Sequence, residues 1–128
     1  MNQPPKPRGL RRFFRSFGWA GRGAFVDFPR GQNARVQICI AIVALISAGL
    51  LRFDRIEWCI LLLTIALVLS LEAVNSAIEG VVDLASPEQS ELARRAKDIA
   101  AGAVLIAAIV ALAIGFILFS PKLLALLR

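Results

Sequence analysis

Four polar side chains recur through the end of a long apolar run, in the stretch LEAVNSAIEGVVD. They are Glu72, Asn75, Glu79 and Asp83, and the run they close opens at Trp58. At about 100° per residue, the last three lie within roughly 60° of Glu72 around a helix axis, so all four share one face. A carboxylate inside a membrane costs at least roughly 2.5 kcal/mol. We therefore expect this face to meet protein or a water-filled cavity.

The two ends of this polar stripe differ in depth. Asp83 can act as a purely interfacial carboxylate, whereas Glu72 lies some two helical turns deeper than Glu79. Carboxylates and an amide, in a chain that has no His, suit a hard cation such as Mg²⁺ completed by water and phosphate oxygens. They suit proton coupling in a small transporter equally well. Both interpretations stay open at this point.

A second polar cluster, RRAKD at residues 94 to 98, precedes the next apolar run. Three cations and a carboxylate beside the polar stripe fit phosphate with a metal better than they fit a transported organic cation. Lys97 and Asp98 are the candidates for that role. For Arg94 and Arg95 the alternative is a membrane anchor on the positively charged side.

The elements that must position these groups belong to an all-α integral membrane protein. Of the 128 residues 58% are hydrophobic and the mean hydropathy is +0.71, which exceeds what a soluble chain of this size can bury. The net charge is +6, and the basic excess falls in the first 35 residues, beside membrane segments. Lipid headgroups and nucleotide phosphates, and not nucleic acid, are therefore the expected partners.

The N-terminal part divides into an expected disordered tail, residues 1–9, and an interfacial helix region, residues 10–33. Aromatic and aliphatic positions alternate with arginines at helical spacing, which is typical of a helix lying in the membrane interface. We expect the glycines at 18, 21, 23 and 31 and Pro29 to break this helix, with a turn or second short helix between Trp19 and Arg30. The apolar positions are Leu10, Phe13, Phe14 and Phe17, and the basic ones Arg8, Arg11, Arg12 and Arg15.

Three transmembrane helices are expected at residues 34–51, 58–82 and 99–119. RFDRIE, residues 52–57, is the expected hairpin. Ser86-Pro87-Glu88 is a helix start signal within the 83–98 loop, and Pro121 is expected to stop the third helix. Eight basic residues precede the apolar run of the first span, which opens at about Val36, and three lie in the 83–98 loop, against two in the hairpin and two after the third span. This asymmetry predicts a cytoplasmic N-terminus and puts the polar stripe on the ATP side of the membrane.

LEAVNSAIEGVVD followed by ARRAKDIAAGAVLIAA resembles the prokaryotic diacylglycerol kinase family. The family signature is E-x-x-N-[ST]-A-I-E-x-x-V-D and then A-K-D-x-x-[AG]-x-A-V-L, and the resemblance covers about residues 10 to 119. It implies a single membrane kinase domain, residues 10–128, in a bacterial inner membrane. It also implies transfer of the γ-phosphate of ATP, with Mg²⁺, to a lipid hydroxyl, and a homotrimer whose sites are shared between subunits.

The resemblance also implies roles for individual residues. Glu72 would be the general base, Glu79 would bind the metal and nucleotide, and Asn75 would order the site. Lys97 and Asp98 would hold the nucleotide phosphates and metal, Asp83 completes the signature, and Asn33 and Arg35 keep the pattern before the first span. The interfacial helix would contribute Arg12, Trp19 and Gly23 to the nucleotide.

The chain departs from the family pattern at Gly31, where family members generally carry a second metal-binding Glu, often as E-R-N. Here the sequence is GQN. Asp27, one helical turn earlier, can place a carboxylate on the same face, although Pro29 lies between them. Trp19 replaces a Tyr and preserves stacking.

Two lipids present a suitable hydroxyl, diacylglycerol and undecaprenol. VVDLASPEQSELARRAKDIAAGAVL and the later FSPKL look closer to the undecaprenol-phosphorylating branch. The alternatives to a lipid kinase are a non-enzymatic or proton-coupled small membrane protein, or a family member impaired by Gly31.

Overall fold

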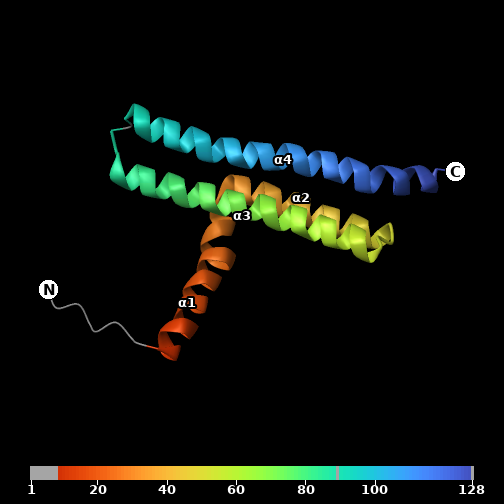
Figure 1. The fold of residues 1–128 in the computed structure, drawn as a ribbon, viewed down its shortest axis with the longest axis horizontal. Helices are drawn as coiled ribbons and strands as arrows, with labels where there is room; N and C mark the ends of the chain where they lie inside the picture. Colours follow the sequence, from red (N-terminus) through yellow and green to blue (C-terminus); the bar gives the residue numbers. More distant parts are fainter. Residues whose placement is uncertain (1–8, 89, 128) are drawn as a thin grey trace.

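The computed structural model describes residues 9–88 and 90–127, and those residues form helices and connecting turns with no strand. Three long helices lie side by side, and a fourth, N-terminal helix projects from them at a steep angle (Figure 1). The predicted all-α membrane fold is confirmed. Residues 1–8, most of the expected disordered tail, lie outside the described residues, and Gly9 is a turn residue.

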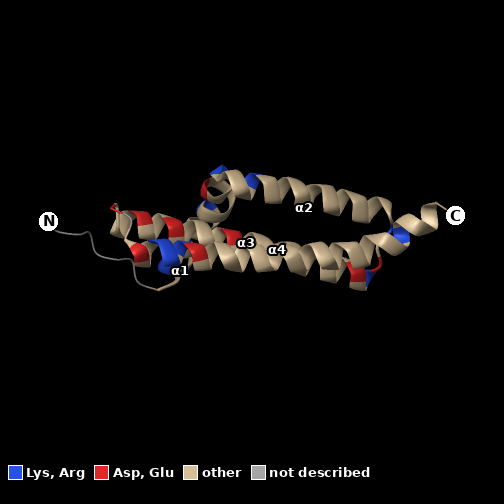
Figure 2. Cartoon of the chain, turned by 90° about the horizontal axis from the view of Figure 1, so that it is seen from above, with Lys and Arg blue, Asp and Glu red and all other residues tan. Residues whose placement is uncertain are grey.

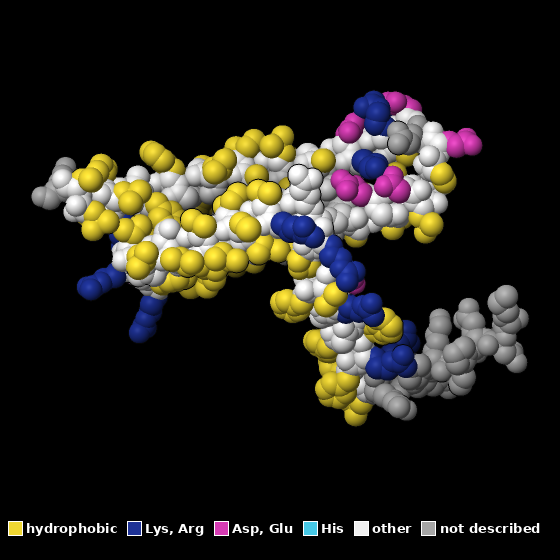
Figure 3. Space-filling view, turned by 180° about the vertical axis from the view of Figure 1, so that it is seen from behind, with side chains coloured by type: hydrophobic (Ala, Val, Ile, Leu, Met, Phe, Trp, Pro, Cys, Tyr) yellow, Lys and Arg dark blue, Asp and Glu magenta, His cyan; other side chains and the backbone are white. Residues whose placement is uncertain are grey.

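The projecting helix, α1 (Leu10–Arg22), has the predicted amphipathic character. Phe13 packs edge-on against Phe17 with ring centroids 5.0 Å apart, and Figure 3 shows apolar side chains on one side of this helix and a row of basic ones on another. An exposed aromatic face opposite arginines suits the membrane interface.

The expected breaks at Gly18 and Gly21 are wrong, because α1 runs through both glycines. A π-helical turn, Gly23–Asp27, and a 3₁₀ turn, Phe28–Arg30, then continue the helical path of the backbone. It ends at Gly31, whose backbone is extended. A glycine inside a helix costs about 1 kcal/mol relative to alanine and does not forbid the helix. The direction of the chain therefore changes at Gly31.

The first long helix, α2 (Gln32–Leu50), packs against α3 through small residues. Ala34, Ala41 and Ala48 are buried at intervals of seven, and this alanine seam lets the two backbones approach closely. Because α2 is shorter than its neighbours, α3 and α4 extend well beyond its N-terminal end (Figure 1).

The second long helix, α3 (Arg55–Ala85), begins three residues before the predicted start at Trp58. Asp54 Oδ1 accepts hydrogen bonds from the N–H groups of Ile56 and Glu57, and Glu57 Oε2 accepts one from the N–H of Asp54 at 2.7 Å. This capping box starts the helix inside the stretch predicted to be the hairpin. The turn itself is therefore only about residues 51–54.

The third long helix, α4 (Glu91–Leu126), corrects two predictions about its ends. It begins after Ser90, whose hydroxyl accepts from the N–H of Ala93 at 3.2 Å, while Ser86 caps the end of α3. Ser86-Pro87-Glu88 is thus the loop and not the helix start. Pro121 lies inside α4 and does not end it.

A tertiary contact explains why the helix continues past Pro121. A proline removes one backbone hydrogen bond and crowds the carbonyl four residues earlier, but Lys122 Nζ lies 2.9 Å from Glu57 Oε2 and 5.8 Å from the centre of the Phe53 ring. Phe53 also packs on Phe119, with centroids 4.8 Å apart. These contacts hold the last turns of α4 against the α2–α3 turn.

The three long helices are each long and apolar enough to cross a membrane. Apart from Glu72, near the middle of α3, their charged residues lie toward the helix ends (Figure 2). The apolar core, formed by Ala48, Phe53, Leu61 and Leu118, lies near the α2–α3 turn. The polar stripe occupies the opposite end, where α3 and α4 pass the start of α2.

Candidate active site

The polar stripe lies on the packed face of α3, in continuation of buried Leu61, and its burial falls along the helix. Glu72 and Asn75 are each only 4% exposed, Glu79 is half-buried, and Asp83 is exposed. The helical repeat places all four side chains on this face. The deep end of the stripe is thus enclosed by protein, and the shallow end opens beside the α3–α4 loop.

Two side-chain amides hold the carboxylates of the stripe. Gln37 on α2 donates from Nε2 to Glu72 Oε2 at 3.0 Å, and Asn75 donates from Nδ2 to Glu79 Oε1 at 3.1 Å. Sequence reasoning missed Gln37. Its position in the sequence could have indicated it, because Gln37 lies between Ala34 and Ala41 of the alanine seam. It is therefore the polar member of the α2 face that packs on α3.

The same two amides present acceptors that have no partner. Among the described residues, Gln37 Oε1 and Asn75 Oδ1 are buried without a hydrogen bond. A buried carbonyl oxygen left unpaired is costly, and most such atoms in proteins are satisfied. Together with the carboxylates they form a group of acceptors suited to a ligand or water that brings hydroxyl donors.

Ion pairs organise the exposed end of the stripe. Lys97 Nζ lies 2.9 Å from Asp83 Oδ1, joining α4 to α3, while Arg94 contacts Asp98 at 2.8 Å and Glu91 at 2.7 Å. Lys97 therefore pairs across the helices and not with its neighbour Asp98. Figure 3 shows these acidic and basic side chains gathered at the α3–α4 loop end.

The pairing affects the charge of Lys97, which precedes the apolar part of α4. Its hydrogen bond to Asp83 raises the pKa of the ammonium, and the nearby charge of Glu79 acts in the same direction. A nearby negative charge favours the charged form of a lysine. Lys97 is therefore a protonated cation at neutral pH, as phosphate binding requires.

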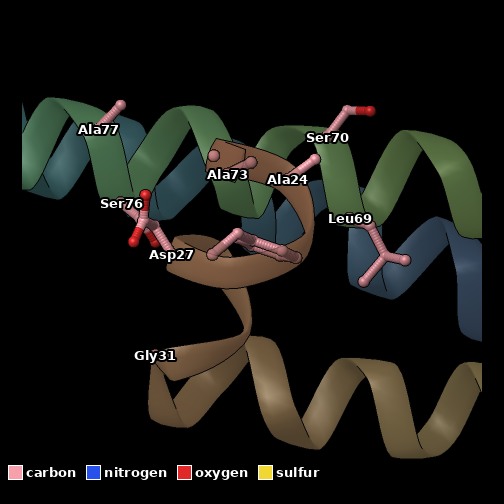
Figure 4. A pocket seen from close by; sticks show the side chains of 10 residues that line it. Ala24, Asp27, Gly31, Leu69, Ser70, Ala73, Ser76 and Ala77 are labelled. Carbon is pink, nitrogen blue, oxygen red and sulfur yellow. The ribbon is translucent and has the colours of Figure 1, made fainter. Parts of the chain in front are cut away.

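A groove of about 640 Å³ separates the segment after α1 from α3. Figure 4 shows Asp27 and Ala24 on one wall, Ala73 and Ser76 on the other, and Gly31 at the edge. Apart from Asp27 and two serines, its lining is small or apolar. It runs along the side of α3 adjacent to the stripe, and its full lining is Gly23, Ala24, Asp27, Phe28, Gly31, Leu69, Ser70, Ala73, Ser76 and Ala77.

Gly31, where the resemblance to the family leads us to expect a metal-binding Glu, lies on this groove. Gly31 has φ −64° and ψ 140°, which any residue can adopt, and a Cβ built there would lie 3.6 Å from its nearest neighbours, an ordinary contact. Asp27 is held by Arg30 at 3.3 Å and Arg22 at 3.9 Å. The backbone thus accepts a longer residue at 31, while the nearby carboxylate already has cationic partners.

The N-terminal site residues are not all brought to the stripe. Gly23 lines the groove, but Arg12 and Trp19 lie on α1, which projects away from the bundle (Figure 1). Trp19 is 64% exposed, and by helical geometry it faces the arginine side of α1.

Two further predicted residues lie at the start of α2. Asn33 is exposed, and Arg35 donates from Nε to the Pro29 carbonyl at 3.1 Å. Arg35 therefore ties α2 to the 3₁₀ turn before it. Neither Asn33 nor Arg35 contributes to the polar stripe of its own chain.

The donor set fits a magnesium ion held jointly with phosphate better than a fully protein-bound metal. In the part of the chain that the structure describes, no three His, Cys, Asp or Glu side chains converge on one point. Mg²⁺ characteristically takes one or two protein carboxylates and keeps water and phosphate oxygens. Glu79, oriented by Asn75 and half-buried, suits that mode.

Comparison with known proteins gives a consistent picture. The family model described as "Prokaryotic diacylglycerol kinase" matches residues 18–119. An undecaprenol kinase of Bacillus subtilis is 42% identical over 114 residues, which cover 89% of this chain and 93% of the relative. A diacylglycerol kinase of Synechocystis is 42% identical over 113 residues, covering 88% of this chain and 65% of the relative. A diacylglycerol kinase of Escherichia coli is 36% identical over 103 residues, covering 80% and 84%.

Proposed function

Because the chain belongs to the prokaryotic diacylglycerol kinase family, we propose that it is a lipid kinase that transfers the γ-phosphate of ATP to the hydroxyl of a membrane lipid. One observation carries this proposal. Glu72 is a buried carboxylate held by an amide, at the deep end of a stripe whose shallow end carries Lys97. A base on the membrane side and cations on the aqueous side match a reaction between a lipid and a nucleotide.

The chemistry then follows the stripe. Glu72 accepts the proton of the lipid hydroxyl while that oxygen attacks the γ-phosphorus. The bond from the γ-phosphorus to the bridging oxygen breaks, and ADP leaves. Charge develops on the phosphoryl oxygens, so positioning and electrostatic stabilisation supply most of the catalysis.

The residues at the shallow end would hold the nucleotide. Lys97 supplies a cation for the phosphates, Asp98 and Glu79 supply carboxylates for the metal, and Asn75 fixes the orientation of Glu79. Mg²⁺, when bound, would neutralise the phosphate charge that develops during transfer. In the absence of nucleotide, the ion pair with Asp83 keeps Lys97 at the site.

The active form that we propose is a homotrimer with shared sites. Arg12 and Trp19 lie on a helix that projects from its own bundle, so they are placed to reach a neighbouring copy. Three helices leave most of their apolar surface exposed, and the described helices leave the stripe open at its loop end. The arginines and Trp19 of α1 would then add phosphate and base contacts to the site of the adjacent subunit.

We place the protein in a bacterial inner membrane with its N-terminus in the cytoplasm. The support is the distribution of basic residues: eleven lie in residues 1–35 or in the 83–98 loop, and four lie elsewhere. Basic residues concentrate on the cytoplasmic side of a membrane protein. This orientation exposes Lys97 and Asp98 to cytoplasmic ATP.

The lipid is an uncharged one with a free hydroxyl, and diacylglycerol and undecaprenol are the two candidates. Relatives named for each are 42% identical to this chain, so identity does not separate them. Purified protein in mixed micelles, incubated with radiolabelled ATP and Mg²⁺ and with either lipid, identifies the substrate. Transfer to neither lipid would argue against a kinase.

A second candidate function is a weakened kinase or a non-enzymatic membrane protein, and the observation that favours it is Gly31 in place of the family acid. A thermal shift separates a kinase, weakened or not, from a non-enzymatic or proton-coupled membrane protein. A kinase that binds MgATP is stabilised by it, since a ligand that binds only the folded state raises Tm. A proton-coupled protein shows no nucleotide effect and binds its substrate in a pH-dependent way.

A further inference from the structure

The residue that contacts the proposed base comes from a different helix and from outside the family signature. Gln37 Nε2 on α2 donates to Glu72 Oε2 on α3 at 3.0 Å. The orientation of the amide follows from chemistry, because an ionised carboxylate only accepts hydrogen bonds and so faces the NH₂ end. Glu72 is thereby held at one oxygen, and its other oxygen, Oε1, is left for a further partner.

The contact lies at a place where packing alone would favour an apolar side chain. Gln37 follows Ala34 by three residues and precedes Ala41 by four, in the alanine seam that brings α2 and α3 together. Its Oε1 is buried without a partner. A leucine or methionine of similar size would remove that unpaired acceptor and fill the same space.

We propose that Gln37 is a positioning residue for catalysis: its amide N–H fixes the rotamer of the Glu72 carboxylate so that Oε1 faces the lipid hydroxyl. This inference rests on the proposed role of Glu72 as the base. A carboxylate at the end of two or three rotatable bonds loses its alignment when a hydrogen bond that defines its rotamer is removed. Misalignment of a reacting group by about 1 Å is enough to lower a rate by on the order of a hundredfold.

The test compares Gln37→Leu with the wild type and with Gln32→Leu, the same substitution on an exposed residue of the same helix. Steady-state kinetics with MgATP and the lipid substrate are measured together with the Tm of each purified protein. Positioning predicts that kcat falls about tenfold or more in Gln37→Leu. KM for MgATP should stay within about twofold, because the side-chain hydrogen bond of Gln37 is to Glu72 and not to a group proposed to hold the nucleotide. Tm is expected to fall modestly, because the buried Glu72 carboxylate loses its donor, partly offset by removal of the unpaired Gln37 acceptor.

A purely structural role for Gln37 predicts that only Tm falls while kcat stays as in the wild type, and an unchanged kcat overturns the inference. Gln37→Met, which keeps an unbranched side chain, gives the same comparison if the leucine variant does not fold. Glu72→Gln is measured in parallel to separate the two proposals. If Glu72→Gln abolishes transfer while Gln37→Leu leaves kcat unchanged, only the positioning role fails; if Glu72→Gln is as active as the wild type, the proposed base fails.

Discussion

Lys97 on α4 and Asp83 on α3 are joined by a 2.9 Å ion pair across the loop that connects the two helices. This contact places the cation beside the carboxylate stripe and on the same end of the bundle as Glu79. It links the two sequence motifs of the site, LEAVNSAIEGVVD and RRAKD, in one arrangement.

Replacement of Lys97 should weaken nucleotide binding. Lys97→Ala removes the protonated amine nearest the stripe, and we expect KM for MgATP to rise about tenfold or more, the effect of losing about 1.4 kcal/mol of phosphate binding. Stability should change little, because an ion pair this exposed contributes less than about 1 kcal/mol. Glu91→Gln breaks the comparable pair with Arg94 away from the stripe and serves as the control. Equal KM values in both variants would contradict the assignment.

A carboxylate at position 31, where the resemblance to the family implies a Glu, should raise turnover. Gly31→Glu fits the observed backbone, because φ is ordinary and a Cβ there meets only normal contacts. If the site lacks a metal ligand, we expect kcat/KM for MgATP to increase several-fold, by about 1 kcal/mol of transition-state stabilisation. Gly31→Gln, which has the same shape without the charge, should show no gain.

The companion measurement concerns Asp27, which lies on the same groove. If Asp27 already supplies the missing carboxylate, Asp27→Asn lowers activity and Gly31→Glu rescues it. If Asp27 only holds Arg22 and Arg30, Asp27→Asn leaves kcat as in the wild type.

Shared sites predict complementation between inactive subunits. Arg12→Ala and Glu72→Gln are each expected to be nearly inactive alone. In trimers assembled randomly from an equal mixture, about a quarter of sites would combine an intact Arg12 from one subunit with an intact Glu72 from the next. Activity near that fraction supports shared sites, whereas no recovery in demonstrably mixed trimers places both residues in the same subunit's site.

The contact between Lys122 and Glu57 should matter for stability and not for chemistry. Both side chains are partly buried and lie at the far end of the bundle from the stripe. Lys122→Met leaves Glu57 without its cation, and we expect a loss of about 1–3 kcal/mol in the free energy of unfolding. Tm should fall while kcat stays within about twofold of the wild type. A large loss of kcat at unchanged Tm would contradict this, because it would show that the Lys122–Glu57 end of the bundle is coupled to the stripe.

The sequence predicted the parts of this structure that depend on local period. The amphipathic N-terminal helix, three long apolar helices and the common face of Glu72, Asn75, Glu79 and Asp83 all follow from helical spacing. The helix ends were less accurate. Pro121 was predicted to end α4, but a contact from Lys122 to Glu57, 65 residues away in the sequence, holds the helix beyond it.

Contacts between helices could not be predicted from helical spacing alone. The hydrogen bond from Gln37 to Glu72 depends on the register of α2 against α3, which the alanine seam determines only once the helices are packed. The pairing of Lys97 with Asp83, and not with Asp98, depends on the short loop between Ser86 and Ser90. A contact of either kind requires the relative placement of two helices.

One comparison isolates the role that we propose for Glu72 as the base of a lipid kinase. Wild type and Glu72→Gln are assayed in mixed micelles for transfer of the γ-phosphate of radiolabelled ATP to lipid, with MgATP-induced thermal shifts recorded to show that both bind nucleotide. We predict that Glu72→Gln keeps the thermal shift and loses transfer by about a hundredfold or more. Transfer at the wild-type rate by Glu72→Gln would contradict it.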